Sequence, residues 1–278
     1  MPHNNQKKIA GINDISGFGR CSTTVSMPII SYMKIQYCPI LTSIFSNHTG
    51  YEDYFFDDYT DKMEAYIAQW KKLDLEFEGI YTGFLGSLKQ IEIVKKFVND
   101  FKTDRTIVIV DPVMGDNGEK YTTYTLDMCK DMEQLVSMAD IITPNITECC
   151  ILTNTDYKSS KWTKLELKDM AEKLAEMGPE KIVITGINMN SYIGNFIYQK
   201  GMEPILLKSK IIGSARCGTG DIFSAIISAD AINGVEFQRS VKKAAAFVQK
   251  CIKVSLERQI PETDGVCFEE VLHTLKIM

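Results

Sequence analysis

The stretch TKLELKDMAEKLAEMGPEKIVIT, residues 163–185, encodes a helix that is followed at once by a strand. The helix is predicted over 163–177, because Thr163 and Glu166 have the spacing of a capping box and Gly178-Pro179 ends it. Its expected buried face carries Leu165, Met170, Leu174 and Met177. The apolar run at 181–185 then predicts a strand. Helix and strand in this order are the building unit of α/β proteins.

The same alternation extends over the rest of the chain. Further apolar runs that predict strands lie at 8–12, 37–44, 79–82, 106–110 and 140–143. Longer segments with helical spacing separate them, which predicts a mostly parallel central sheet with helices on its faces. Residues 192–210 depart from this rhythm: YIGNFIY and PILLKSK flank the turn-like QKGME and predict a β-hairpin, either at an edge of the sheet or as a flap.

The composition is that of an ordinary folded α/β protein. The 278 residues contain no internal repeat or linker, so we expect one domain over 1–278 with a small flap-like excursion near 46–60. A net charge of −5 argues against a nucleic-acid partner. The eight cysteines form no CxxC pair, which argues against a zinc site, and no apolar run is long enough to span a membrane. We expect a cytoplasmic protein with reduced thiols.

The strongest chemical signal is CGTGDIFSAIISADAING, residues 217–234. Gly218, Thr219 and Gly220 precede an apolar helix, so their backbone N–H groups can converge on an anion such as phosphate. Asp221 lies in the first turn and points into the same loop. A base beside an anion hole suits phosphoryl transfer to an alcohol. An ordinary N-capped helix after a glycine turn accounts for the segment equally well.

Two further groups of polar residues follow predicted strands. Asp111 and Asp116, in VDPVMGDNG, can hold Mg²⁺ or orient a water in its shell, although two successive turns also explain the segment. In ADIITPNITE, Pro144 ends a strand, and Asn145 and Glu148 have the spacing of a helix cap and its third residue. Both would face the strand-end crevice, where ligands of open α/β sheets bind. An ordinary capping arrangement fits them as well.

The segments after the first two strands are candidates for substrate contacts. IAGINDISGFGRCS, residues 9–22, offers Asp14 and Ser16, and we expect a tight glycine turn to bring both to a polar substrate. Ser22 replaces the third glycine of a dinucleotide fingerprint, which argues against a nicotinamide cofactor. His48 and Thr49 follow the second strand and precede an aromatic cluster, which is either a flap or a packed loop.

Taken in order, these segments resemble the pyridoxal (vitamin B6) kinases of the ribokinase superfamily, over nearly the whole chain. GTGD at 218–221 and NxxE at 145–148 resemble motifs of the superfamily. FSNHTGY at 45–51, TGFLGS at 82–87 and DPVMGD at 111–116 resemble motifs of the B6 kinases in particular. The resemblance implies a ribokinase-like three-layer α/β/α fold, ATP as phosphoryl donor, Mg²⁺ and a homodimer, and it leaves a monovalent cation open.

The resemblance also implies roles for individual residues. Asp221 would take the proton from the substrate hydroxymethyl group, while Gly218 and Gly220 would cradle the γ-phosphate. The implied substrate contacts are Asp14, Ser16, Thr49 and Asp221. The implied ATP site consists of Asp111, Asp116, Asn145, Glu148, Thr185, Gly218, Thr219 and Gly220, with Asp111 and Glu148 beside the metal.

One departure from the B6 kinases bears on the substrate. NDISGFG resembles the DxSG segment of the hydroxymethylpyrimidine kinases, so the substrate is either pyridoxal, pyridoxamine or pyridoxine, or else a hydroxymethylpyrimidine. A sugar or nucleoside kinase is the nearest rival among enzymes. The alternative of a nicotinamide-dependent oxidoreductase assigns no function to the GTGD motif. A catalytically silent binding module would be expected to have lost Asp221.

Overall fold

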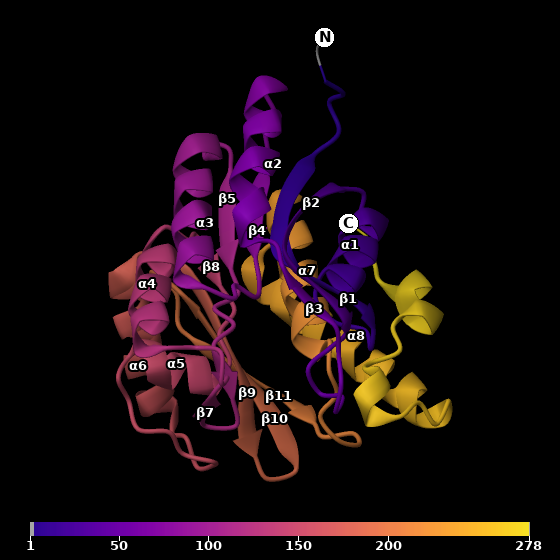
Figure 1. Cartoon of the computed structure of the whole chain (residues 1–278). Helices are drawn as coiled ribbons and strands as arrows, with labels where there is room; N and C mark the ends of the chain where they lie inside the picture. The colour runs from indigo at the N-terminus through magenta and orange to yellow at the C-terminus, as the bar shows by residue number, and fades with distance from the viewer. Residues whose placement is uncertain (1–2, 278) are drawn as a thin grey trace.

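The computed structural model describes residues 3–277, and a nine-stranded sheet runs through its middle (Figure 1). The strands of this sheet are β1 (Lys8–Phe18), β2 (Gln36–Asn47), β3 (Phe56–Asp58), β4 (Gly79–Thr82), β5 (Ile107–Val110), β8 (Ile141–Ile142), β9 (Lys181–Met189), β10 (Tyr192–Gln199) and β11 (Ile205–Lys210). Their order is β11-β10-β9-β8-β5-β4-β1-β2-β3. The strands from β9 to β2 are parallel, and an antiparallel extension lies at each edge. A separate hairpin consists of β6 (Gly115–Asp116) and β7 (Glu119–Lys120).

Helices cover both faces of the sheet (Figure 1). One face packs against α2 (Thr60–Lys72), α3 (Leu88–Phe101), α4 (Leu126–Ser137), α5 (Ile146–Leu152) and α6 (Lys164–Met177). The other face packs against α1 (Thr23–Tyr32), α7 (Thr219–Ile232) and α8 (Phe237–Glu257), with the short helices η1 (Glu262–Asp264) and η2 (Glu269–Thr274) near the end of the chain. Each face buries its own apolar core, which confirms the predicted three-layer α/β/α fold.

The local sequence signals are largely confirmed. All six predicted strands belong to the parallel part of the sheet, and residues 192–210 form its β10–β11 edge. At α6, the Thr163 hydroxyl accepts the Glu166 N–H and the Glu166 carboxylate accepts the Thr163 N–H, as the capping box requires. The predicted apolar stripe was wrong at Leu165, which is 79% exposed. Leu167 takes its place, because only residue 167 is spaced three and seven residues from Met170 and Leu174.

Two predicted loops turn out to be partly strand. β1 continues to Phe18, so Asp14 and Ser16 lie inside a strand and not on a turn after it. The parallel register with β2 shifts by one residue between Asn13 and Ile15, which places an irregularity at Asp14. The excursion expected near 46–60 is shorter than predicted, because β2 runs to residue 47 and β3 pairs back onto it. Residues 48–55 connect β2 to β3, and Tyr59 leads into α2.

The topology locates the functional edge of the sheet. The chain passes from β1 through α1 to β2 on one side, and later places β4 against the other side of β1. The connections that leave the carboxyl ends of β1 and β4 therefore diverge. Open α/β sheets bind ligands at the point between two such connections. Within residues 3–277, no helix is long and apolar enough to cross a membrane. All eight cysteines are free thiols.

Candidate active site

The N-terminus of α7 is the candidate anion-binding position of the site. Gly218 caps the helix in a left-handed conformation, with φ of 84°. A side chain at this position would collide with the carbonyl oxygen of Arg20, so the turn between β1 and α1 packs directly against the glycine. Thr219 and Gly220 belong to the first turn of the helix and not to a preceding loop. The first N–H groups of a helix have no partner within it, so they are available to a phosphate.

Asp221 lies in the same first turn and reaches toward β1. Burial raises the pKa of Asp221, while the backbone of Ser22 and the side chain of Asn13 lower it. A carboxylate whose pKa is raised by burial is a better proton acceptor than an exposed one, which makes Asp221 a candidate base.

Asp14 approaches Asp221 from β1. It is buried, and the Ser16 hydroxyl donates to its Oδ2 at 3.4 Å. Burial raises the pKa of Asp14 from 3.8 to about 7, and the neighbouring Asp221 charge adds to the rise, while the Ser22 and Ser16 hydroxyls oppose it. Asp14 and Asp221 therefore face a common space, and at neutral pH Asp14 can either donate or accept a hydrogen bond.

Asp111 and Glu148 form a second pair of carboxylates at the ends of neighbouring strands. Asp111 follows β5, and its Oδ2 accepts the hydroxyl of Ser224 from α7 at 2.8 Å. Burial raises the pKa of Asp111 to about 7, with the Asp221 charge contributing. Glu148 accepts the N–H of Asn145 at 2.7 Å and that of Met114 at 3.2 Å. Burial and the Asp111 charge raise the pKa of Glu148 well above its usual value.

These two carboxylates fit a magnesium ion that also binds phosphate. The Asp111 charge raises the pKa of Glu148, and a nearby cation would relieve the repulsion between the two carboxylates. Within the described part of the chain, no three His, Cys, Asp or Glu side chains gather as a complete metal site. Mg²⁺ commonly uses only one or two carboxylates, together with waters and substrate phosphates.

Asn145 and Thr185 line the far side of this pair. Asn145 caps α5, where its Oδ1 accepts the Glu148 N–H at 2.9 Å and completes the predicted capping box. Its Nδ2 donates to the carbonyl of Gly115 at 2.8 Å. Asn145 thus positions Glu148 and the β6–β7 hairpin, and little of its amide is left for a phosphate. Thr185 pairs with Asn145 as an isolated bridge.

The remaining predicted residues lie at the rim. Asp116 is exposed in β6, where its carboxylate accepts the Asn117 N–H at 2.8 Å. Thr49 is exposed in the turn after β2. The neighbouring His48 ring contacts the carbonyl of Thr263 at 2.6 Å, which ties this turn to η1.

Sequence reasoning missed three residues that shape the site, namely Asn13, Ser22 and Ser224. Ser22 was considered only as a missing glycine, yet its hydroxyl lowers the pKa of Asp14 and its backbone lowers that of Asp221. Ser224 lies three residues after Asp221, one helical turn further on, and this spacing could have indicated a residue on the same face.

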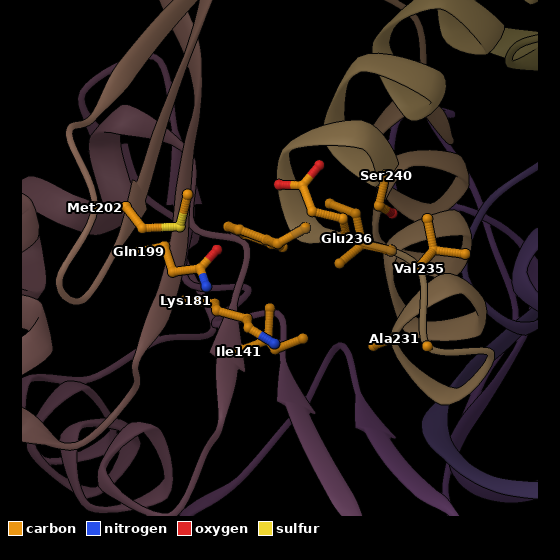
Figure 2. Close-up of a pocket in the computed structure, with 11 residues that line it drawn as sticks. Ile141, Lys181, Gln199, Met202, Ala231, Val235, Glu236 and Ser240 are labelled. Carbon is orange, nitrogen blue, oxygen red and sulfur yellow. The ribbon is translucent and has the colours of Figure 1, made fainter.

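A cavity of about 260 Å³ lies elsewhere, at the opposite edge of the sheet (Figure 2). Ile141 and Lys181, the first residues of β8 and β9, line it together with Gln199 and the start of α8. Figure 2 shows Gln199 and Met202 on one side and Glu236 on the other. The cavity therefore lies at the amino ends of the strands, whereas the four carboxylates lie at the carboxyl ends.

A helix start that can bind an anion, a carboxylate beside it and two further buried acidic residues are the arrangement expected of a small-molecule phosphotransferase. The family model of phosphomethylpyrimidine kinases matches residues 31–263, and the chain belongs to this family. A Bacteroides thetaiotaomicron protein assigned to the phosphomethylpyrimidine kinases, crystallised with pyridoxal, is 37% identical with a TM-score of 0.94, covering 98% of this chain and 96% of its own.

Relatives of both substrate types match the chain. The pyridoxal kinase of Arabidopsis thaliana is 25% identical over 248 residues, which is 86% of this chain and 78% of that protein. The hydroxymethylpyrimidine/phosphomethylpyrimidine kinase of Bacillus subtilis is 27% identical over 185 residues, which is 66% of each. These matches confirm the resemblance to pyridoxal kinases of the ribokinase-like superfamily, and they leave two substrate classes to be distinguished.

Proposed function

We propose that this protein is an ATP-dependent kinase that phosphorylates the hydroxymethyl group of a B6 vitamer to its 5′-phosphate. The observation that carries the proposal is the position of the Asp221 carboxylate in the first turn of α7, beside the N–H groups that follow Gly218. The substrate oxygen bonds to the γ-phosphorus as the bond to the bridging oxygen of ATP breaks and ADP leaves. The hydroxyl proton passes to Asp221.

Two parts of the site would stabilise the negative charge of the phosphoryl group during transfer. The first N–H groups of α7 would bind the γ-phosphate and the charge that develops on it. Asp111 and Glu148 would hold Mg²⁺, which neutralises the phosphates when it is bound. Without a cation, four carboxylates would repel a triphosphate, so we expect ATP to bind as its magnesium complex.

The aromatic ring of the substrate would be recognised from β1. Asp14, whose pKa is raised to about 7, can exchange a hydrogen bond with a ring nitrogen in either protonation state. Ser16 orients Asp14 through its hydroxyl. The Bacteroides thetaiotaomicron relative was crystallised with pyridoxal, which supports a pyridine ring as the substrate.

A hydroxymethylpyrimidine kinase is the second candidate. Asp14 and Ser16 stand in the segment that resembles the DxSG motif of those enzymes, and both side chains are buried at the site. A pyrimidine also presents a ring nitrogen beside a hydroxymethyl group, so Asp14 by itself fits either ring.

A panel of phosphorylation assays tests the proposal. Pyridoxal, pyridoxamine, pyridoxine and 4-amino-5-hydroxymethyl-2-methylpyrimidine are each incubated with ATP, Mg²⁺ and the protein, with ribose and a nucleoside as controls. We expect a B6 vitamer to give kcat/KM at least about tenfold above that of the pyrimidine, since each 1.4 kcal/mol of transition-state binding is worth that factor. Phosphorylation of the pyrimidine alone would favour the second candidate, and phosphorylation of ribose or the nucleoside alone would contradict both.

A further inference from the structure

Ser224 is a buried serine of α7 whose hydroxyl is directed away from its own helix. It lies three residues after Asp221 and is 2% exposed. A serine hydroxyl inside a helix often donates to the carbonyl four residues earlier. Ser228, one turn further along α7, does so, and its Oγ lies 2.7 Å from the carbonyl oxygen of Ser224. The hydroxyl of Ser224 instead donates across to Oδ2 of Asp111, at the end of β5, at 2.8 Å.

A second hydroxyl fixes the direction of this hydrogen bond. Oγ1 of Thr143 lies 3.0 Å from Oγ of Ser224, and both side chains are buried. An ionised carboxylate only accepts, and a serine hydroxyl has one proton to give. Ser224 therefore donates to Asp111 and accepts the hydroxyl proton of Thr143. The three side chains form one chain of hydrogen bonds from the end of β8 through α7 to the end of β5.

This chain occupies one oxygen of Asp111 and leaves the other available. The backbone of Asp111 is fixed, because its N–H donates to the carbonyl of Thr82 at 3.0 Å. The hydroxyl of Ser224 then holds Oδ2. Among residues 3–277, no donor is hydrogen-bonded to Oδ1, and the side chain of Asp111 is only partly buried. A ligand can therefore reach Oδ1 without displacing a hydrogen bond of the protein.

The segment that supplies Thr143 also positions the second carboxylate of the pair. The N–H of Thr143 donates to the carbonyl of Val110 at 3.2 Å, directly before Asp111. Two residues after Thr143, the N–H of Asn145 donates to the Glu148 carboxylate at 2.7 Å. Hydrogen bonds from one stretch at the end of β8 therefore help to set the positions of both carboxylates.

We propose that Ser224 is a positioning residue for the nucleotide: oriented by Thr143, its hydroxyl holds Oδ2 of Asp111 so that Oδ1 is left for the magnesium–ATP complex. The inference rests on the proposed function, because it needs a nucleotide that binds together with Mg²⁺. A serine that served the fold alone could donate to its own helix, as Ser228 does. The two roles differ in one measurable property, which is whether losing the hydroxyl weakens nucleotide binding only when Mg²⁺ is present.

Ser224→Ala tests this property by calorimetry with the ATP analogue AMP-PNP and no vitamer. We expect the affinity for the analogue with Mg²⁺ to fall by about 5- to 10-fold, near the lower end of the range for residues that orient metal-binding side chains. The affinity measured in EDTA should stay within about twofold. Ser228→Ala is the matched control, because it removes a buried hydroxyl from the same helix without touching Asp111. It should leave both affinities within about twofold.

Two substitutions at Thr143 test the chain from its other end. Thr143→Val keeps the shape and loses the hydroxyl, so it should weaken binding only with Mg²⁺, whereas Thr143→Ser keeps the hydroxyl and should restore it. In a Ser224→Ala background, Thr143→Val should cost less than about a further twofold, because the donor to Asp111 is already gone. If Ser224→Ala does not fold, the two variants of Thr143 decide the question.

The binding measurements separate the inference from the proposed function. Wild-type affinity of Ser224→Ala for the magnesium complex would overturn the inference alone, and so would an equal loss with and without Mg²⁺. A full additional loss in the double variant would do the same. Failure of the wild-type protein to bind AMP-PNP with Mg²⁺ would overturn the proposed function and the inference together.

Discussion

Replacing Asp14 by Asn should stabilise the ligand-free protein at alkaline pH and not at acid pH. Burial raises the pKa of Asp14 from 3.8 to about 7. Between these two values the native state holds a proton that the unfolded state has lost, so the free energy of unfolding falls as the pH rises through that window. The slope is about 1.4 kcal/mol per pH unit, which amounts to on the order of 4 kcal/mol at pH 8. Below pH 4 both states are protonated and the penalty vanishes.

Asparagine has the shape of the protonated carboxyl group and does not ionise. Each kcal/mol shifts Tm by about 2–4 °C in a domain of this size, so Asp14→Asn should melt several degrees above the wild type at pH 8. At pH 4.5 the penalty is about 1 kcal/mol, so the two proteins should differ by only about 2–4 °C. Circular dichroism melts without ATP or vitamer measure this, with Asp53→Asn in an exposed loop as control. Equal Tm differences at both pH values, or a variant destabilised at pH 8, would refute the reasoning.

Three further predictions concern the metal, a thiol and the loop after β2. Asp111→Asn and Glu148→Gln should raise the Mg²⁺ concentration for half-maximal activity by about tenfold or more, and should change the KM for the vitamer less. An unchanged Mg²⁺ titration would mean that both residues have a structural role only. Cys217→Ala should keep at least about half of kcat, since the phosphoryl group passes directly to the substrate; a folded but inactive variant would point to a covalent step. Hydrogen exchange at 48–55 should slow when an ATP analogue and vitamer bind together, whereas identical exchange would make the loop fixed scaffold.

The sequence predicted the features that depend on neighbours in the chain. The capping boxes at Thr163 and Asn145 are local, because residues within one helical turn satisfy each other. The expected turn at Asp14 and Ser16 was wrong because pairing with β2 extends β1 to Phe18 despite its glycines. Strand pairing is non-local, so it can override a turn signal.

The candidate site was also predicted only in part. The sequence identified the polar residues at strand ends and at the start of α7, since the carboxyl ends of parallel strands lie on the same side of the sheet. The contacts of Asn13 could not be predicted, because its side-chain oxygen accepts the N–H of Phe84, which follows another strand far along the chain. A buried asparagine in a strand gives no sign of the direction of its amide until its partners are placed.

The role of Asp221 as the base is tested most directly by the turnover of Asp221→Asn with a B6 vitamer, ATP and Mg²⁺ at saturation. We predict a fall of about two to four orders of magnitude in kcat, the range of a general base, while ATP affinity measured by calorimetry stays within about threefold. The amide keeps the size of the carboxylate and removes its basicity. A folded variant that retains more than about a tenth of wild-type kcat would contradict this role.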